Sequence, residues 1–190
     1  MSASTKKKQG RDRILSAAGE VFAERGLEGA SLRAIAARAG YTPAALYFHF
    51  DSREAIYAEL LRASLADLAA AIAEAAKGPD AFRAGALALF DFYAARPQEL
   101  ALGLYLGPGG PAPRGLGQEI DPALNALLLA ALAPIRDAAP QPDPDARVAE
   151  IFAQAVGLLV LAETRRLRLF GLAARGLMER MLDRMEEPTC

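Results

Sequence analysis

Apolar residues recur at intervals of three and four positions along nearly the whole chain. This spacing places side chains on one face of an α-helix, whereas a half-buried strand needs strict alternation. No stretch of alternating β-branched residues predicts a strand. Because 53% of the 190 residues are hydrophobic, the helices have enough apolar surface to bury a core. The sequence therefore predicts an all-α fold.

Capping residues, glycines and prolines divide the pattern into about nine helices. The first helix is closed by Gly26 and Gly29, and the second opens at Ser31 and stops at Gly40. Thr42-Pro43 then starts a short third helix. A long fourth helix follows a capping sequence at 51–54 and ends near Lys77, and the glycine- and proline-rich run 107–113 predicts a loop. The remaining helices are predicted over 82–97, 98–105, 121–139, 145–169 and 172–185.

Positive charge is concentrated at the start of the chain. Residues 1–50 contain eight Lys/Arg and four Asp/Glu, a net charge of +4, although the whole chain carries −1. A basic segment of this kind is typical of nucleic-acid binding. Residues 1–10 include Lys6, Lys7 and Lys8 but no apolar stretch of a secretory signal, which predicts a disordered basic arm. A solubilising tail is the alternative interpretation of the three lysines.

Several classes of function find no support in the sequence. Cys190 is the only cysteine and His49 the only histidine, which excludes an intramolecular disulfide and a cysteine- or histidine-based metal cluster. The most apolar stretch, 151–162, is far shorter than the ~20 residues that cross a bilayer. No phosphate-binding loop and no nucleophile beside a base is evident. We therefore expect a cytoplasmic protein without a cofactor or metal and without a membrane partner.

Residues 31–50 form the most informative segment. Two short predicted helices meet at Gly40, and the second is narrow enough to enter the major groove of DNA. The small residues at its start, Thr42 to Ala44, would let its backbone approach the bases. One helical turn separates Leu46 from Phe50, so we expect both to point inward with Ala45. Tyr47 and His49 would then lie on the outward side.

This segment resembles a known family. The run Ala45-Leu46-Tyr47-Phe48-His49-Phe50 after the turn Gly40-x-Thr42 is similar to the most recognisable stretch of the TetR family of bacterial regulators. The resemblance covers residues 13–61, about a quarter of the chain. Beyond residue 61 only the helical plan agrees.

The resemblance implies roles for individual residues at a DNA interface. Ser31 and Arg33 would touch the sugar–phosphate backbone, and Tyr47 and His49 would hydrogen-bond phosphates. The residues expected to face base edges are Tyr41, Thr42, Pro43 and Ala44. The basic residues expected to add charge or to reach the minor groove are Lys6, Lys7, Lys8, Arg11 and Arg13.

Two positions depart from the family pattern. Pro43 stands where the family often has a long polar side chain, so we expect apolar contact with thymine methyl groups to be prominent. Asp51-Ser52-Arg53 lacks the lysine often found at the start of the fourth helix, and Arg53 is the candidate substitute. Taken alone, His49 and Tyr47 would be interpreted as ordinary structural residues.

The resemblance also implies a domain plan: an arm over 1–10, a helix-turn-helix domain over 11–52, and a helical ligand-binding and dimerisation domain over 53–187. Candidates for lining a ligand cavity are Phe82, Phe90, Tyr93, Leu104, Tyr105 and Phe152, for which ordinary core packing is the alternative. Candidates for the homodimer surface are Val156, Leu159, Val160, Leu167, Leu177, Met181 and Leu182, for which packing within the subunit is the alternative.

The expected function follows from this plan. We expect a homodimeric repressor that binds a palindromic double-stranded DNA operator and is released by a largely apolar small molecule, not an enzyme. The alternative is a small all-helical enzyme or lipid carrier with an incidental helix-turn-helix.

Overall fold

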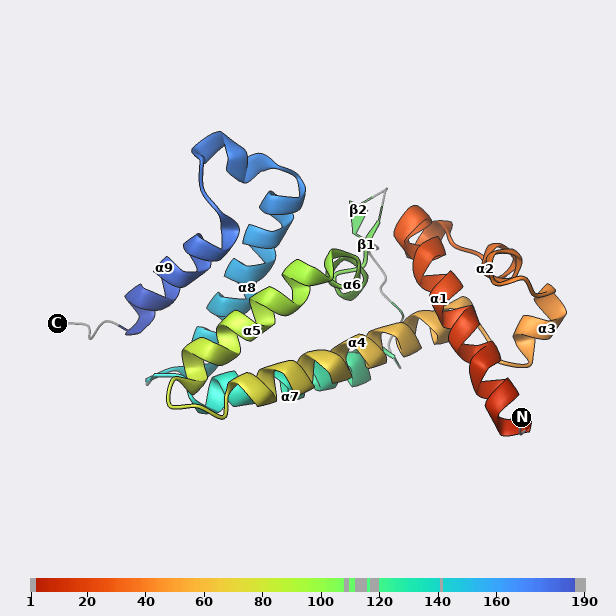
Figure 1. Ribbon diagram of the computed structural model, residues 1–190, viewed down its shortest axis with the longest axis horizontal. Helices are drawn as coiled ribbons and strands as arrows, with labels where there is room; N and C mark the ends of the chain where they lie inside the picture. Colours follow the sequence, from red (N-terminus) through yellow and green to blue (C-terminus); the bar gives the residue numbers. More distant parts are fainter. Residues whose placement is uncertain (1–2, 108–109, 112–115, 117–119, 141, 187–190) are drawn as a thin grey trace. The chain divides into compact units, whose positions relative to one another are not determined.

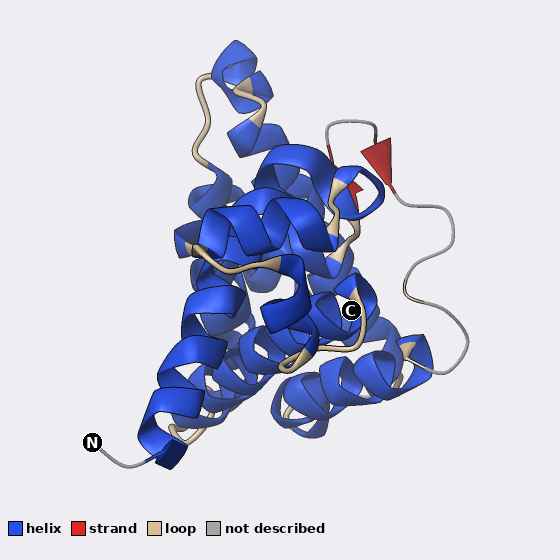
Figure 2. Cartoon of the chain, turned by 90° about the vertical axis from the view of Figure 1, so that its right-hand side faces the viewer, coloured by secondary structure: helices blue, strands red, loops and turns tan. Residues whose placement is uncertain are grey.

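The all-α prediction is confirmed. The computed structural model describes residues 3–107, 110–111, 116, 120–140 and 142–186, which form nine α-helices, a 3-10 helix and a two-residue antiparallel ladder (Figures 1 and 2). The α-helices are α1 (Ala3–Gly29), α2 (Leu32–Ala39), α3 (Pro43–Tyr47), α4 (Arg53–Ala75), α5 (Ala81–Ala95), α6 (Pro97–Gly103), α7 (Asp121–Asp137), α8 (Pro144–Glu163) and α9 (Ala174–Glu186). The ladder pairs β1 (Leu106–Gly107) with β2 (Gly110–Pro111), and the 3-10 helix is η1 (Arg166–Phe170).

Helix boundaries near the start of the chain lie where local chemistry predicts them. Gly26 interrupts α1 with a φ of 67° and a ψ of 178°. Ser31 caps α2 by accepting a hydrogen bond from the Ala34 amide at 3.2 Å. Gly40 ends α2 in the left-handed conformation, with a φ of 73°. Thr42 caps α3 in the same way as Ser31, through the Ala45 amide at 3.1 Å.

The structure departs from the expected disordered arm, because α1 already begins at Ala3. Alanine, lysine and glutamine are good helix formers, so nothing in this run stops the helix from extending toward the N-terminus. Gly10 fixes the extension in place, since it is buried against Tyr41 and His49. A Cβ atom added to Gly10 would lie 3.0 Å from the Tyr41 hydroxyl oxygen. The side chains of Lys6 and Lys7 lie outside the described residues.

Two further boundaries differ from the prediction. Helix α8 ends at Glu163 and not near residue 169, because Arg165 adopts the left-handed conformation with a φ of 59° and η1 follows. No glycine or proline lies at this end of the helix, and the apolar periodicity continues past it. The sequence therefore gave no signal that the helix ends there. The expected loop over 107–113 contains β2 and the end of β1, which are too short for sequence periodicity to reveal.

Contacts divide the chain into two compact units. The first contains Met1–Ser64 and Ala101–Asn125, and the second contains Leu65–Leu100 and Ala126–Cys190. Residues after α6 belong to the first unit through Tyr57, whose hydroxyl donates to the Leu102 carbonyl at 2.7 Å and whose ring stacks on Tyr105 with centroids 5.8 Å apart. The Tyr105 hydroxyl in turn lies 2.8 Å from Asp121 Oδ1. The domain plan predicted from the sequence did not assign residues 101–125 to the same unit as the helix-turn-helix.

Each unit has its own apolar core. The first buries, among others, Ile14, Ala18, Phe22, Ile35, Leu46, Phe50, Ile56 and Tyr57. The second buries, among others, Leu68, Ile72, Leu89, Phe90, Ile135, Ile151, Met178 and Leu182. Ion pairs of Arg83 with Asp183 at 2.8 Å and of Arg175 with Asp91 at 3.0 Å join α9 to α5 in the second unit.

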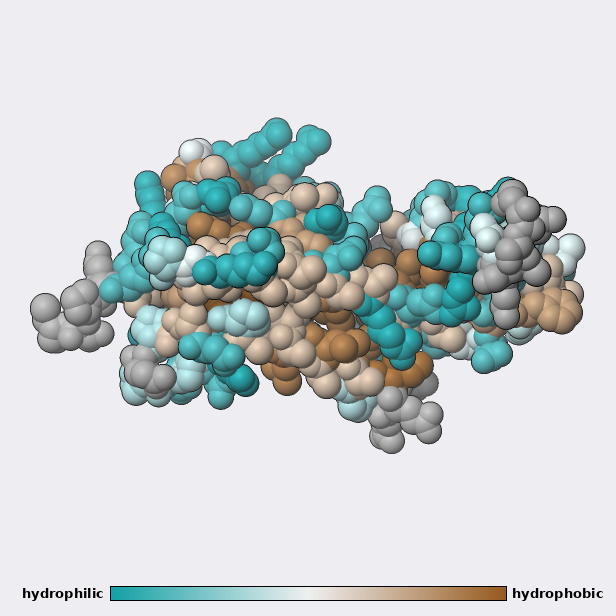
Figure 3. Space-filling model, turned by 60° about the horizontal axis from the view of Figure 1, so that its bottom comes forward, coloured by the Kyte–Doolittle hydropathy of each residue, from teal (hydrophilic) through white to brown (hydrophobic). Residues whose placement is uncertain are grey.

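Some apolar side chains remain at the surface, and Figure 3 shows one face on which they gather between hydrophilic residues. The exposed large apolar residues are Tyr47, Phe48, Leu127, Leu129, Val160, Leu161, Leu169, Phe170 and Leu172. None of the helices in the described part of the chain combines the length and hydropathy that crossing a membrane requires.

Candidate nucleic-acid interface

The turn between α2 and α3 sets the direction of the short third helix. The Gly40 amide donates to Ala37 O at 3.2 Å, and the Tyr41 amide donates to Ala36 O at 2.8 Å, which satisfies carbonyl groups at the end of α2. Pro43 occupies the first turn of α3, where its missing N–H costs nothing. Leu46 and Phe50 are buried, as predicted, and anchor the helix to the first unit.

The opposite side of α3 is exposed. Thr42, Pro43 and Ala44 offer a surface with little side-chain bulk. Tyr47 follows with 57% of its surface exposed, and Phe48 with 86%. A narrow helix edge beside exposed aromatic side chains is the kind of surface that the major groove of DNA can admit.

Sequence reasoning assigned no role to Phe48. The amphipathic pattern accounts for Leu46 and Phe50, and the resemblance drew attention to Tyr47 and His49. The available signal was hydrophobicity itself, because an aromatic residue that fits no buried face of its helix must lie at the surface. Phe48 therefore joins the candidate interface.

The side chains of Tyr41 and His49 are both half-buried. His49 is therefore less exposed than the outward orientation that the sequence predicted for it. Their rings meet edge-on with centroids 6.1 Å apart, and both lie against Gly10 of α1. The His49 Nδ1 atom is buried and has no hydrogen-bond partner among the described residues. His49 therefore packs α3 against α1 as well as lying near the candidate surface.

Arg11 has partners inside the first unit. Its Nε atom donates to Glu59 Oε1 at 2.8 Å, and its Nη1 atom donates to the His49 carbonyl at 2.9 Å. Its guanidinium carbon also lies 4.2 Å from the centroid of the Phe50 ring. These contacts tie α1 to the end of α3 and to α4. The sequence predicted that Arg11 adds charge or reaches the minor groove, and these contacts argue against that role.

Arg53 is engaged in a similar way. Its Nη1 atom donates to the Ala30 carbonyl at 2.9 Å and to the Glu28 carbonyl at 3.1 Å, at the end of α1. Its Nε atom lies 2.6 Å from Glu54 Oε1. Burial would raise the pKa of Glu54, but hydrogen bonds, above all from Arg53, lower it. Arg53 thus binds carbonyl groups at the end of α1.

The other basic candidates whose side chains the structure describes, Lys8, Arg13 and Arg33, are exposed.

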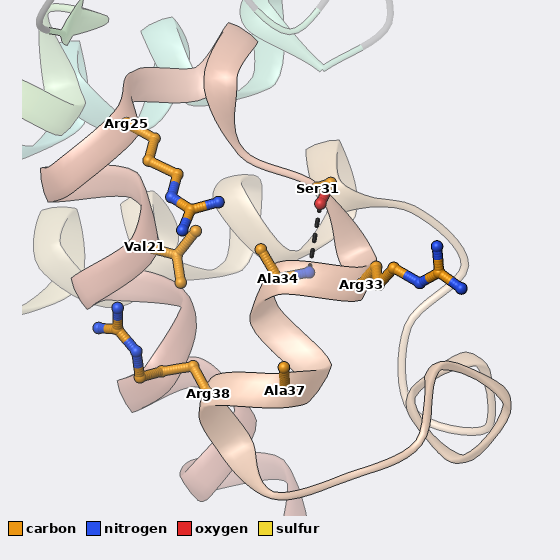
Figure 4. Close-up of a pocket in the computed structure, with 7 residues that line it drawn as sticks. All are labelled: Val21, Arg25, Ser31, Arg33, Ala34, Ala37 and Arg38. Atoms are coloured by element: carbon orange, nitrogen blue, oxygen red, sulfur yellow. Dashed lines mark hydrogen bonds between the residues drawn. The ribbon is translucent and has the colours of Figure 1, made fainter.

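An open groove of about 640 Å³ lies between α1 and α2 (Figure 4). Its lining residues are Val21, Arg25, Ser31, Arg33, Ala34, Ala37 and Arg38. Arg38 bonds Glu24 at 2.8 Å and Glu20 at 2.9 Å, which raises the pKa of Arg38 and lowers that of Glu24. Arg25 and Arg33 form no ion pair with any described residue. Of the three arginines that line the groove, Arg38 is neutralised by acidic neighbours, so the guanidinium groups of Arg25 and Arg33 supply its remaining positive charge.

The six candidates for a ligand cavity do not all fall in one unit. Phe82, Phe90, Tyr93 and Phe152 belong to the second unit, and the first three are buried. Leu104 and Tyr105 belong to the first unit. Burial, with the charge of Glu99 as a second cause, raises the pKa of Tyr93 to about 12. Among the described residues no group of three or more His, Cys, Asp or Glu side chains could hold a metal ion.

Most of the candidates for the homodimer surface are used inside the subunit. Leu159, Leu167, Met181 and Leu182 are buried in the second unit. Val156 and Leu177 are half-buried, and Val160 is exposed. The apolar periodicity marks the face that packs on α5 and the rest of the second unit, because an inward face and a partner-binding face leave the same pattern in a sequence.

Comparison with known proteins finds relatives of the helix-turn-helix part of the first unit. Residues 14–60 match the family model described as bacterial regulatory proteins, tetR family. Over 58 residues the chain is 47% identical to the HTH-type transcriptional repressor KstR2 of Rhodococcus jostii, a match that covers 30% of this chain and only 28% of KstR2. The curated relatives are thus matched over about a quarter of their length.

Similarity of fold extends over the whole chain. The crystal structure of the regulatory protein SCO4313 aligns with a TM-score of 0.80 at 24% identity, covering 99% of this chain and 100% of that one. The regulator FadR of Bacillus subtilis, solved in complex with stearoyl-CoA, aligns with a TM-score of 0.73 at 17% identity and covers 94% and 98% of the two chains. Residues 14–60 thus match the tetR family model of bacterial regulatory proteins, and the chain as a whole shares the fold of these solved structures.

Proposed function

We propose that this chain is a transcriptional repressor that binds a palindromic operator as a homodimer and is released by a small molecule. The observation that carries the proposal is α3 itself, a helix with one face anchored by Leu46 and the other exposed. A helix packed for structural reasons alone would not leave Tyr47 and Phe48 at the surface. The name of KstR2, a repressor, supports the same direction of control.

Contacts with DNA divide into two kinds. Thr42, Pro43 and Ala44 face the bases, where Pro43 and Ala44 favour apolar contact with thymine methyl groups. Tyr47 and Phe48 lie toward the phosphates, with Arg33 and Ser31 at the start of α2. Exposed Lys8 and Arg13 add positive charge. Arg11 and Arg53 support the domain from inside.

Two copies of the interface determine the symmetry of the operator and the spacing of its half-sites. Two-fold symmetry requires a palindromic site, and half-sites one helical turn apart are separated by about 34 to 36 Å. The effector is largely apolar, because the candidate side chains of the second unit, Phe82, Phe90, Tyr93 and Phe152, are aromatic. FadR with its bound stearoyl-CoA is a precedent for an effector of this kind in the same fold. The effector must favour the non-binding conformation by about 1–3 kcal/mol.

A DNA shift assay tests the proposal. The probe is the promoter fragment of the gene itself, and retention is measured at graded salt. The double substitution Arg33→Ala with Tyr47→Ala should abolish retention and leave the helical content unchanged. Arg180→Ala removes an arginine that is also exposed, from α9, and should have no effect. Unchanged DNA affinity in the double variant, or no salt-dependent retention of the wild type, would contradict the proposal and favour an enzyme or carrier.

A further inference from the structure

The corner between α5 and α6 holds a carboxylate with one unsatisfied oxygen. Glu99 lies in the first turn of α6, and its Oε1 atom is 3.5 Å from Nε of Arg96. Its Oε2 atom is buried and has no hydrogen-bond partner among the described residues. Such an oxygen costs free energy, because burial removes it from water and no donor compensates for the loss. The corner therefore calls for a hydrogen-bond donor that the described residues do not supply.

A second polar group without a partner lies close to this oxygen. Tyr93, in the last turn of α5, is only 5% exposed. Unlike the hydroxyl groups of Tyr57 and Tyr105, that of Tyr93 forms no hydrogen bond with a described residue, although a buried tyrosine usually does. Burial and, as a second cause, the charge of Glu99 raise the pKa of Tyr93 to about 12, so the carboxylate and the hydroxyl are close enough to interact. The two groups thus form one polar cluster.

Backbone hydrogen bonds fix the corner that carries this cluster. The Arg96 amide donates to the Tyr93 carbonyl at 3.1 Å. The amides of Glu99 and Leu100 donate to the Arg96 carbonyl at 3.0 Å and 3.2 Å. All four residues belong to the second unit. Tyr93 and Glu99 are therefore held in place by the backbone, without a hydrogen bond between their side chains.

Apolar side chains accompany the cluster in the chain. The rings of Phe92 and Tyr93 meet edge-on with centroids 5.2 Å apart. Leu89 and Phe90, which precede them in α5, and Leu100, which follows Glu99 in α6, are buried. Polar groups in such a setting are typical of ligand sites, where a few of them orient a mainly apolar molecule.

Arg96 leaves the charge of the inner oxygen available. Its Nε atom approaches Oε1 of Glu99, whereas Oε2 has no partner among the described residues. The Arg96 side chain is 44% exposed, so solvent screens its attraction to Glu99. Its guanidinium carbon lies 4.3 Å from the centroid of the Phe92 ring, which shows that the aromatic groups of this corner attract a cation.

We propose that Glu99 and Tyr93 bind the basic head group of the effector, an ammonium group on an apolar body. The ammonium group donates hydrogen bonds to Glu99 Oε2 and to the Tyr93 hydroxyl oxygen, and the carboxylate neutralises its charge. An alcohol offers a donor but no charge, and a carboxylate on the ligand would be repelled by Glu99. The inference rests on the proposed function, because it specifies the chemical class of the effector proposed there.

Probes of one shape test the head group. Phenylbutylamine, phenylbutanol and phenylbutyrate differ only at one end, and a matching set with an octyl body covers an effector without a ring. Calorimetric titration of the full chain without DNA, near neutral pH, measures each dissociation constant. The amine should bind about tenfold or more tightly than the alcohol, because hydrogen bonds to charged groups are the stronger ones, and the carboxylate should bind most weakly. Equal binding of amine and alcohol, tightest binding of the carboxylate, or no binding of either set at millimolar concentration would overturn the inference.

Substitutions identify the residues that bind the head group. Glu99→Gln keeps the shape of the side chain without its charge, so it should weaken amine binding about tenfold or more and alcohol binding much less. Tyr93→Phe should weaken both about two- to tenfold. Glu179→Gln is the matched control and should change neither, since Glu179 lies in the same unit, pairs with an arginine and has a side chain 39% exposed, against 32% for Glu99. Equal losses of amine and alcohol in Glu99→Gln would overturn the inference and show that Glu99 only maintains the corner.

A shift assay with the promoter fragment separates this inference from the proposed function. Release of the fragment by the amine in wild type but not in Glu99→Gln would support both. If wild type retains the fragment but the amine does not bind, the inference fails and the proposed DNA binding stands. If the amine binds through Glu99 but wild type does not retain the fragment, the site stands and the proposed repressor fails.

Discussion

At the scale of single residues, Gly40 illustrates how backbone conformation determines the interface. Its φ of 73° turns the chain from α2 into α3, and its Cβ position lies only 2.9 Å from Arg13 Nη2. The substitution Gly40→Ala should therefore lower the free energy of unfolding by about 1 kcal/mol, through left-handed strain and displacement of Arg13. Urea unfolding measures the change.

Gly19 provides the control for this substitution. It lies within α1, and a Cβ atom there would meet nothing within 4 Å. Gly19→Ala should stabilise the protein by about 0.5–1 kcal/mol, because alanine has the higher helix propensity. Equal effects of the two substitutions would show that the conformation of Gly40 is not the source of its cost.

The raised pKa of Tyr93 predicts that the protein loses stability at alkaline pH. Burial, together with the charge of Glu99, raises its pKa in the folded state to about 12, whereas a tyrosine in an unfolded chain has a pKa of about 10. The folded state therefore holds this proton more tightly, and its stabilising effect is complete below pH 10 and lost between pH 10 and 12. At pH 11 the loss is about 1 kcal/mol.

The substitution Tyr93→Phe tests this reasoning, since phenylalanine cannot ionise. Between pH 10 and 12 the variant should lose less stability than wild type, by about 1 kcal/mol at pH 11. Chemical unfolding at each pH measures the difference. Tyr57 and Tyr105, whose pKa values burial also raises, should account for part of the loss that remains. Identical pH dependence in the two proteins would refute the assignment to Tyr93.

At the scale of elements, the sequence predicts what local chemistry decides. Ser31, Gly40 and Thr42 fix the ends of α2 and α3 through their own side chains and backbone conformations, so their positions could be predicted. The end of α8 could not, because Arg165 takes a conformation that its residue type does not favour. The inner partners of Arg11 and Arg53 were also hidden, since Glu59 and the Ala30 carbonyl are distant in sequence.

Substitutions on the two sides of α3 should affect different properties: those of buried residues should lower stability, and those of exposed residues at its end should lower DNA affinity. Leu46 is fully buried, so Leu46→Ala should cost about 2–5 kcal/mol of unfolding free energy. Phe48 is 86% exposed, so Phe48→Ala should change stability by less than about 0.5 kcal/mol while weakening operator binding. Thermal unfolding and a DNA shift assay on the same samples measure both quantities. A large loss of stability in Phe48→Ala would show that Phe48 has a packing role instead.

At the scale of the whole molecule, the division into units limits what a sequence can reveal. The helix-turn-helix is continuous in the chain, so its residues and much of the candidate interface could be predicted together. Residues 101–125 return to the first unit only through contacts such as Tyr57 with Leu102. Leu104 and Tyr105 were therefore grouped with aromatic residues of the second unit, because no local pattern reports a long-range contact.

Salt dependence connects the charge of the whole molecule to the proposed interface. For duplex DNA the slope of log K against log salt is about −0.9 for each neutralised phosphate. The proposed homodimer contains two copies of Arg33, which is exposed and forms no ion pair with another described residue, so Arg33→Ala should make the slope shallower by about 2. Arg11 already holds Glu59 and the His49 carbonyl, so Arg11→Ala should leave the slope unchanged and lower the stability of the first unit. Titrations of operator binding from low to moderate salt measure both slopes. If Arg11→Ala changes the slope as much as Arg33→Ala does, Arg11 must exchange its internal partners for phosphates on DNA, and the first unit must rearrange when it binds.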